Sequence, residues 1–386
     1  MWRATYAGRM STPRPPAPRT KGWVIGHVVG APVILAPSWL LAAVVLTLVF
    51  APSVRARSGE SGAAVYVVAL AFVVLLFGSV LVHELAHGLV ARARGQQPHE
   101  FVLTLWGGHT SFGGAAPTPA TSALVAAVGP LANLLLAGAF LAAAQSVDPW
   151  SVAGLLLYSG AISNGFVGVF NLIPGLPLDG GRVLEAVVWA ITKSRHTGTV
   201  AAGWTGRVVA VLLFAWALVW PLVQGVQPDL VNVVWTVFIA AFLWAGATAS
   251  VRSGRTQRAV HGLTVASVAS PAVGVPYSDS VAHAGTTAAA VGAHEVVLLS
   301  PDGRPAAYVD RAAAAAVPAD AAGSTPVTSV AITLPAGAVV DGSLAGAPLI
   351  AALSEATRVS PVVAAVVDGR VVGLIRATDV IAAIQA

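Results

Sequence analysis

The sequence contains no cysteine, which excludes disulfides and thiolate metal sites. Any metal bound by this chain must therefore be held by His, Asp or Glu. Charged residues are also scarce, at 10% of the 386 residues, whereas soluble domains average about 25%. Because 56% of the residues are hydrophobic, much of the chain must face lipid.

Lysine is nearly absent, with two residues against 19 arginines, and Ala, Gly and Val abound. We interpret this bias as the mark of a GC-rich coding genome, which favours a bacterial source. The net charge is +5. The basic balance therefore requires no nucleic acid partner, and we expect none.

Apolar runs of membrane-spanning length fill the first two thirds of the chain, since a helix needs about 20 apolar residues to cross a bilayer. We expect six transmembrane helices, at roughly 37–52, 63–91, 120–145, 152–174, 203–223 and 229–250. Residues 180–192 predict a short helix at the membrane edge. The fold class expected is a polytopic α-helical membrane protein followed by a C-terminal α/β domain.

Composition also predicts the domain boundaries. Residues 1–36 form a basic, Pro-rich N-terminal segment with a short strand region, and they lack the apolar core of a cleavable signal. Residues 37–251 form the six-helix membrane domain and 252–261 a linker. Residues 262–386, which are rich in Ala, Val and Gly with regular polar interruptions, form a second, soluble domain.

The positions of Arg and Lys predict the orientation in the membrane. One side receives the basic N-terminal segment and the basic residues of the loops near 92–94, 182–195 and 252–258, whereas the other side receives only Arg55 and Arg57. We therefore expect a multi-pass protein of the plasma membrane with both termini in the cytoplasm.

The loop between the second and third spans alternates partly over residues 100–106 and is then broken by Gly107 and Gly108. This pattern predicts a β-hairpin or a re-entrant segment. A strand edge in that place would pair with an extended peptide by β-augmentation.

The C-terminal region contains a tandem repeat. Residues 296–309 predict a strand, a turn and a strand before an Ala-rich helix, and residues 362–384 repeat the pattern. Units of this kind indicate a paired α/β module.

The most informative motif is His83-Glu84-Leu85-Ala86-His87, near the end of the second apolar run. Residues i and i+4 share one helix face, so both imidazoles can bind one Zn²⁺ while Glu84 polarises a water molecule. A buried His pair that satisfies backbone groups is the plain alternative. The glutamate and two histidines are costly at lipid depth without a function.

A catalytic zinc site needs a third protein ligand. Asp179 lies in a Pro- and Gly-rich break after the fourth span, at the depth inferred for His83, and we assign it as that ligand. Capping of the helix that starts near Gly180 is the competing role. Arg182 and Glu185, three residues apart, are expected to form a surface ion pair.

Three separated motifs together resemble those of the site-2 protease family of intramembrane zinc metalloproteases, in the subgroup with a C-terminal pair of CBS domains. They are His83 to His87, Gly129-Pro130-Leu131-Ala132-Asn133, and residues 171–181. The resemblance implies one Zn²⁺ held by His83, His87 and Asp179, with Glu84 as general base and then acid.

The resemblance also implies that Asn133 and Asn171 contact the substrate or the oxyanion of the transition state, unless they form interhelical hydrogen bonds. For Asn164, an interhelical bond is expected. His109 follows Gly108 in the predicted hairpin and is a candidate for substrate contact, with an exposed loop histidine as the alternative.

By the resemblance, the substrate is a single-pass transmembrane protein, such as an anti-sigma factor or a remnant signal peptide, cut within or near its membrane segment. The CBS pair implies an adenine nucleotide at Thr378 and Asp379, although Arg376 replaces the hydroxyl residue of the family pattern. A dimerising or structural role is the alternative. The competing functions are a CBS-regulated metal transporter and a non-catalytic membrane scaffold.

Overall fold

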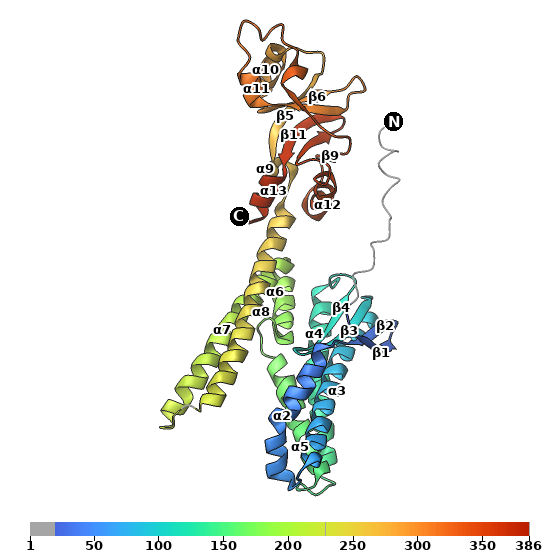
Figure 1. The fold of residues 1–386 in the computed structure, drawn as a ribbon, viewed down its shortest axis with the longest axis vertical. Coiled ribbons are helices and arrows are strands. Elements are labelled where there is room, and N and C mark those ends of the chain that lie inside the picture. Colours follow the sequence, from blue (N-terminus) through green and yellow to red (C-terminus); the bar gives the residue numbers. More distant parts are fainter. Residues whose placement is uncertain (1–19, 228, 386) are drawn as a thin grey trace. The chain divides into compact units, whose positions relative to one another are not determined.

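The computed structural model describes residues 20–227 and 229–385, so the Pro-rich part of the predicted N-terminal segment lies outside the described residues. The chain divides into two compact units, Met1–Val251 and Arg252–Ala386 (Figure 1). The first unit holds the apolar helices and a small sheet, and the second is an α/β domain.

Six helices of the described chain are long and apolar enough to cross a membrane, which confirms the predicted number. They are α2 (Ser38–Ser58), α3 (Ala63–Ala93), α4 (Pro119–Ala144), α5 (Val152–Asn171), α7 (Arg195–Val223) and α8 (Leu230–Gly262). The predicted edge helix is α6 (Asp179–Thr192). Several helices extend beyond the predicted spans because hydropathy marks the lipid-facing part of a helix and not its ends.

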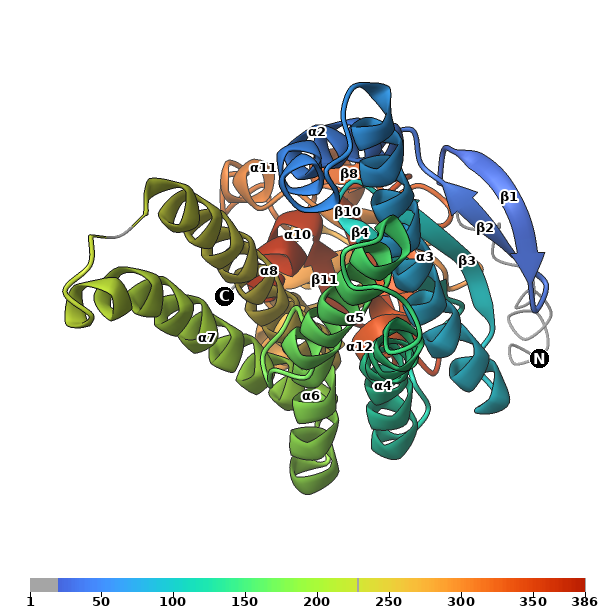
Figure 2. The ribbon, with the colours of Figure 1, turned by 90° about the horizontal axis from the view of Figure 1, so that it is seen from below.

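Helix α3 packs against α2, α4 and α5 (Figure 2). Small residues let these helices approach closely. A Cβ on Gly168 of α5 would lie 3.0 Å from the carbonyl oxygen of Pro130 on α4. This close packing fixes the positions of the polar side chains between the helices.

The predicted hairpin is present and forms part of a larger sheet. Strands β1 (Trp23–Val28), β2 (Ala31–Leu35), β3 (Pro98–Thr104) and β4 (Gly107–Phe112) lie in that order, with β2 and β3 parallel and the other pairs antiparallel. Phe101 of β3 is fully buried against Leu81 and Leu85 of α3. A Cβ on Gly88 would lie 2.3 Å from the Phe101 ring, so glycine is needed where the sheet meets α3.

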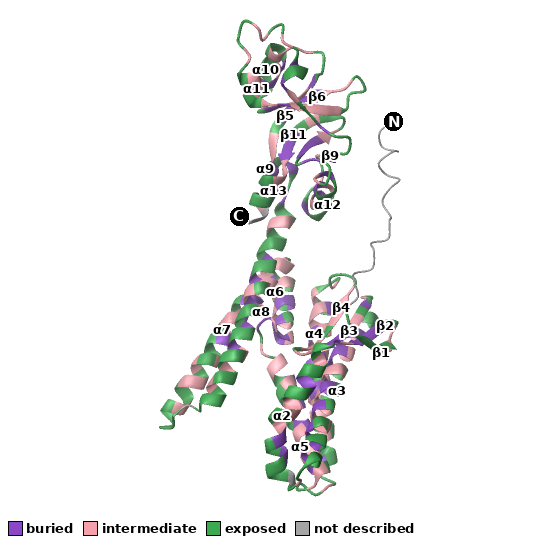
Figure 3. Cartoon of the chain, viewed as in Figure 1, coloured by how far each residue is buried: buried purple, intermediate pink, exposed green. Residues whose placement is uncertain are grey.

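The Pro- and Gly-rich segment that follows α5 packs against α7. Leu176 donates a backbone hydrogen bond to Ala202 (3.0 Å), and Gly206 lies so close that its Cβ would overlap the Leu176 carbonyl oxygen. On α8, Gly246 packs in the same way against Pro177. The distal halves of α7 and α8 are largely exposed, as expected for lipid-facing helices (Figure 3).

The C-terminal unit contains the predicted repeat of two strands and a helix, and in each copy a further strand and helix precede it. The strands form a seven-stranded sheet in the order β8-β7-β6-β5-β11-β10-β9. After α9 (Val265–Val268), the first copy is β5 (Ala269–Pro276), α10 (Val281–Ala290), β6 (Glu295–Leu299), β7 (Pro305–Val309) and α11 (Arg311–Ala315). A 3₁₀ turn, η1 (Val327–Val330), and β8 (Ala331–Thr333) lead into the second copy. It comprises β9 (Val339–Asp341), α12 (Gly346–Ala356), β10 (Val362–Val367), β11 (Arg370–Arg376) and α13 (Ala377–Gln385).

Candidate metal centre

The three predicted metal ligands lie together inside the membrane unit. His83 and His87 share one face of α3, and Asp179 is the first residue of α6. One ligand atom from each residue lies within 4.8 Å of the others. The two histidines are buried, and Asp179 is 15% exposed.

The ligand atoms have the spacing of one face of a tetrahedral zinc site. Nε2 of His83 lies 3.0 Å from Nε2 of His87 and 3.0 Å from Oδ2 of Asp179, and the third side of the triangle is 3.3 Å. Zinc bonds of about 2.0–2.1 Å place neighbouring ligand atoms of a tetrahedron about 3.3–3.4 Å apart. The donor set and its spacing therefore fit Zn²⁺.

The outer nitrogens of both imidazoles face carbonyl groups. Nδ1 of His87 lies 2.6 Å from the backbone oxygen of Val125, and Nδ1 of His83 lies 2.5 Å from Oδ1 of Asn133. Because these oxygens can only accept hydrogen bonds, each Nδ1 must donate, which leaves a lone pair on each Nε2. Two lone pairs and a carboxylate then face one another, and a cation is the group that such a set of acceptors requires.

A chain of hydrogen bonds fixes the orientation of Asn133. Asn164 of α5 donates from Nδ2 to the Gly160 carbonyl (2.9 Å) and to Ser79 (2.9 Å), so its Oδ1 must accept. It accepts from Nδ2 of Asn133 at 2.8 Å, which turns Oδ1 of Asn133 toward His83. Second-shell partners of this kind orient metal ligands and set their tautomers. The interhelical bond expected for Asn164 is confirmed.

The position of Gly129 beside the two imidazoles explains why the Gly129-Pro130 motif begins with glycine. A Cβ at this position of α4 would lie 2.4 Å from Nε2 of His87 and 2.8 Å from Cε1 of His83. Any larger residue would therefore displace the imidazoles. The motif supplies both the space for the ligands and, four residues later, the amide that orients one of them.

Glu84 is buried next to the two ligand histidines on α3 and is held by strand β4. Thr110 donates from its hydroxyl to Oε2 of Glu84 at 2.8 Å. A Cβ on Gly108 would lie 2.5 Å from Cγ of Glu84, so the glycine allows the strand to approach the carboxylate side chain. The hairpin thus lies against the candidate general base, as the sequence suggested.

The structure does not bring His109 to the metal ligands. Successive side chains of a strand point to opposite faces, and Gly108 and Thr110 occupy the face of β4 toward Glu84. His109 is exposed, and its backbone pairs with Val102. This placement matches the alternative of an exposed loop histidine. Thr110, the next residue, is the one that contacts the site.

The two asparagines differ from the role that the resemblance implies. Both polar atoms of Asn133 are occupied by His83 and Asn164, and the residue is 1% exposed, so its geometry favours orientation of His83 over contact with a substrate. Asn171 donates to the carbonyl of Val167 one turn earlier on α5, at 3.0 Å. No described contact joins Asn171 to the metal ligands.

The predicted ion pair between Arg182 and Glu185 is wrong. Glu185 is 7% exposed and binds Arg195 of α7 at 3.0 Å, whereas Arg182 lies at an exposed position. The helix spacing of three residues indicates contact only where both residues share an exposed face, and Glu185 packs against α7. In the second unit, Thr378 and Asp379 are both exposed at the start of α13.

Two features of the site, and one cation outside it, had weak or no sequence signals. The Val125 carbonyl has none, because every residue carries a backbone acceptor. Thr110 is signalled only by its even spacing from Gly108 along the strand. Arg207, a cation within the fifth span, is visible in the sequence but is concealed by the apolar residues around it.

Comparison with known proteins supports the metal site. Residues 71–149 and 145–215 match the family model "Peptidase family M50". This part of the chain is therefore similar to members of that peptidase family. All three candidate ligands and Glu84 lie within the matched residues.

Curated proteins similar to this chain have names of the same kind. A Synechocystis protein named "Putative zinc metalloprotease sll0528" is 33% identical over 242 residues, which cover 62% of each chain. "Putative zinc metalloprotease Rip3" of Mycobacterium tuberculosis is 38% identical over 200 residues, which cover 50% of this chain and 49% of the relative. The matches therefore span about half to three fifths of these relatives.

Among solved structures, the site-2 protease of Methanocaldococcus jannaschii matches 60% of this chain and 95% of its own, with 23% identity and a TM-score of 0.41.

Proposed function

We propose that this chain is an intramembrane zinc endopeptidase that cleaves single-pass membrane proteins within or near their transmembrane segments. The observation that carries the proposal is the set of three acceptor atoms on α3 and α6, within 3.3 Å of one another, with Glu84 beside them. Helix α3 is apolar enough to span a membrane, so the same residues that suit peptide hydrolysis lie in a membrane helix. The match of residues 71–149 and 145–215 to the M50 peptidase model supports the reaction class.

His83, His87 and Asp179 would hold the metal. Bound Zn²⁺ supplies Lewis-acid chemistry, which acidifies a water molecule and polarises a peptide carbonyl. Glu84 would take a proton from the attacking water and return it to the leaving amine. Thr110 would keep the Glu84 side chain in place through its hydrogen bond to Oε2.

The sheet supports an extended substrate. β4 is the last strand in the order β1-β2-β3-β4, so its outer edge has no strand partner among the described residues. A substrate that unwinds locally could add to this edge by β-augmentation. The residues of β4 that face Glu84, Gly108 and Thr110, would then bring the peptide backbone toward the general base.

The identity of the substrate is part of the proposal. Release of a cytoplasmic fragment from an anti-sigma factor and removal of remnant signal peptides are the two roles we propose. Both need a single-pass substrate whose membrane segment can unwind, and the two classes of substrate can be compared directly in one cleavage assay.

The test combines metal analysis with cleavage by the wild type and by Glu84→Gln. We expect one zinc per chain in both proteins, and about 10²–10⁴-fold slower cleavage by the variant, which is the usual contribution of a general base. A metal transporter in place of a peptidase predicts transport that persists in Glu84→Gln. A scaffold predicts protein without zinc.

The orientation of the chain can be tested because the sequence has no cysteine. We propose that both termini lie in the cytoplasm, on the basis of the Arg distribution. A single cysteine at exposed Ser253 should be labelled by a membrane-impermeant maleimide only after cell lysis, whereas one in the loop near Glu60 should be labelled in intact cells. The reverse pattern would reject this orientation.

For the C-terminal unit we propose regulation, with binding of an adenine nucleotide at Thr378 and Asp379 or dimerisation as the means. Both side chains are exposed, which leaves them accessible to a ligand. Arg376 forms an ion pair with Glu295 at 2.9 Å and is therefore not free to bind a nucleotide. Calorimetric titration of ATP and AMP into the full chain tests the nucleotide, because heat that is lost in Thr378→Ala supports it. Absence of heat would reject the nucleotide and leave a dimerising or structural role.

A further inference from the structure

Arg207 is a cation in the fifth membrane span that the peptidase site does not use. Its guanidinium carbon lies 4.5 Å from the ring centre of Trp204 and 5.3 Å from that of Trp244 on α8. Its Nε donates to the hydroxyl of Thr248 at 3.3 Å. No carboxylate of the described chain forms an ion pair with it.

The position of Arg207 along α7 corresponds to the depth of lipid headgroups. From Arg207 to the end of α7 at Val223 is about 24 Å, and from the start of α8 at Leu230 to Thr248 is about 27 Å, at a rise of 1.5 Å per residue. The hydrocarbon core of a bilayer is about 30 Å thick. With the polar turn between α7 and α8 at one boundary of the core, Arg207 and Thr248 lie near the other.

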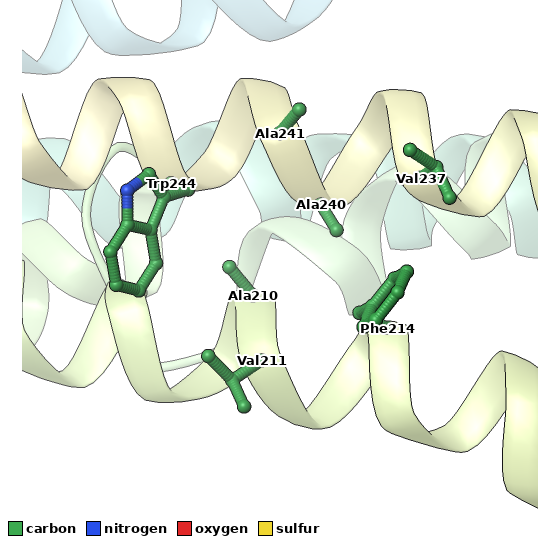
Figure 4. Close-up of a pocket in the computed structure, with 7 residues that line it drawn as sticks. All are labelled: Ala210, Val211, Phe214, Val237, Ala240, Ala241 and Trp244. Atoms are coloured by element: carbon green, nitrogen blue, oxygen red, sulfur yellow. The ribbon is translucent and has the colours of Figure 1, made fainter.

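An apolar groove extends from this polar group toward the middle of the membrane. It encloses about 260 Å³ between α7 and α8, with Trp244 at one end and Phe214 and Val237 at the other (Figure 4). Ala210 and Ala240 form its floor, where small side chains leave the space. Trp244 borders both the groove and the Arg207 guanidinium, so the two features are continuous.

The donors of Arg207 remain available to a ligand. A guanidinium carries five N–H donors in a planar fork that suits phosphate, and only the donor on Nε has a described protein acceptor. The two tryptophans that contact the guanidinium, Trp204 and Trp244, are 48% and 45% exposed, so this group is accessible from the lipid side of the helices.

We propose that α7 and α8 form a binding site for one anionic phospholipid. Its phosphate accepts hydrogen bonds from the Arg207 guanidinium and the Thr248 hydroxyl, and one acyl chain lies in the groove between Ala210 and Ala240. The cation lies at headgroup depth and the apolar groove extends toward the middle of the membrane. This arrangement matches the negative headgroup and the acyl chain of one lipid. The site is independent of the peptidase reaction.

The test uses the full chain purified in detergent and stripped of lipid. Phosphatidylglycerol and phosphatidylcholine with the same acyl chains are titrated separately, and bound lipid is counted by native mass spectrometry. We expect the first phosphatidylglycerol to bind at least about tenfold more tightly than phosphatidylcholine, as a charge-assisted contact implies. Equal binding of the two lipids would overturn the proposal.

Variants locate the site. Arg207→Gln should abolish the preference for phosphatidylglycerol, and Arg207→Lys should retain part of it because the charge remains. Arg255→Gln removes the same charge from an exposed position of α8 and should leave the preference unchanged. If Arg207→Gln fails to fold, loss of preference in Arg207→Lys by at least about threefold supports the site. Unchanged binding by every Arg207 variant that folds rejects it.

A last pair of measurements separates a lipid from a free phosphate. Glycerol phosphate, the soluble headgroup, should bind at least about tenfold more weakly than phosphatidylglycerol because it lacks the chain that fills the groove. Ala241→Phe fills the groove from an exposed position and should weaken only the lipid. Equal affinity for the two ligands, or no effect of Ala241→Phe, would show an anion site without a place for the chain.

Discussion

The two units of the molecule bury different kinds of side chain. In the membrane unit the buried set includes His83, Glu84, His87, Asn133 and Asn164. In the C-terminal unit, Glu295 and Ser360 are the buried polar residues within the described range, and the cores consist of Val, Leu, Ile and Ala.

This difference follows from the solvent that each unit faces. A membrane helix can expose apolar side chains to lipid, so burial in the unit does not require hydrophobicity, and polar residues there are kept only where they have partners or chemistry. A water-facing α/β domain must bury its apolar side chains. Buried polar groups therefore locate the function of the first unit, whereas the buried residues of the second report mainly on packing.

The largest expected effect comes from Gly129→Ala, which adds one methyl group to the polar core. The new Cβ would lie 2.4 Å from Nε2 of His87 and force the ligand imidazoles apart. We expect bound zinc to fall well below one per chain and cleavage to drop about 100-fold or more. Metal content of the purified protein and cleavage rate measure the effect.

Gly138→Ala is the matched control, because it makes the same change on the same helix. A Cβ at Gly138 would meet nothing within 4 Å. Zinc and activity should therefore remain as in the wild type. If both variants lose zinc equally, the effect belongs to helix α4 as a whole and not to contact with the imidazoles.

The next largest effect is expected from Asn164→Leu, which removes a polar residue that contacts no metal ligand. Without Oδ1 of Asn164, the Asn133 amide is free to rotate, and its NH₂ group can face His83 in place of the carbonyl oxygen. Zinc affinity should fall about 10–100-fold, the usual cost of a lost second-shell partner. Competition with a chelator of known affinity measures it.

Ser163→Ala provides the comparison for Asn164, since Ser163 is adjacent and its hydroxyl donates to a carbonyl of its own helix, the one partner it has among the described residues. Its zinc affinity should match that of the wild type. An Asn164→Leu protein with unchanged affinity would contradict the hydrogen-bond chain and leave Asn133 to orient His83 alone.

Two neighbouring residues of β4 test the strand faces with a smaller effect. Thr110→Val removes the hydroxyl that donates to Glu84 and should lower kcat about tenfold, with zinc content unchanged. His109→Ala alters the opposite, exposed face and should change kcat less than about twofold. The reverse ranking would return His109 to the site and remove Thr110 from it.

Much of the fold could be predicted because its signals are local or periodic. The six spans follow from apolar length, the hairpin from alternation broken by Gly107, and the C-terminal repeat from its turns. The approach of Asp179 to His83 and His87 could also be expected, since an intramembrane carboxylate needs a partner and the Pro- and Gly-rich break sets its depth.

What could not be predicted depends on which way a side chain turns. The sequence shows Asn133 near the ligands but not that its oxygen faces His83, because that orientation is set through Asn164 by the Gly160 carbonyl. It shows Glu185 three residues from Arg182 but not that α7 covers Glu185 and supplies Arg195. Such choices are made by packing between helices, and no local pattern records them.

The smallest effect on catalysis is expected from the buried pair of the C-terminal unit. Glu295 is 3% exposed, its Oε1 accepts from Arg376 at 2.9 Å, and its Oε2 has no hydrogen-bond partner among the described residues. Arg376→Leu leaves this carboxylate buried and unpaired. Solvent screens this ion pair in part, because the Arg376 side chain is 36% exposed, so the loss should be smaller than for a fully buried pair. We expect a loss of about 2 kcal/mol in the free energy of unfolding of this unit and no change in zinc content.

Urea-dependent proteolysis of the C-terminal unit in the full chain measures that loss. Arg370→Leu, at an exposed position of the same strand β11, should shift the urea midpoint little. The double variant Arg376→Leu/Glu295→Leu should recover most of the stability, because an apolar pair often replaces a buried ion pair without cost. If the double variant is as unstable as Arg376→Leu, the pair contributes more to the stability of the unit than the neutralisation of each charge by the other. The C-terminal unit would then also depend on a specific buried polar contact, and the contrast with the membrane unit would weaken.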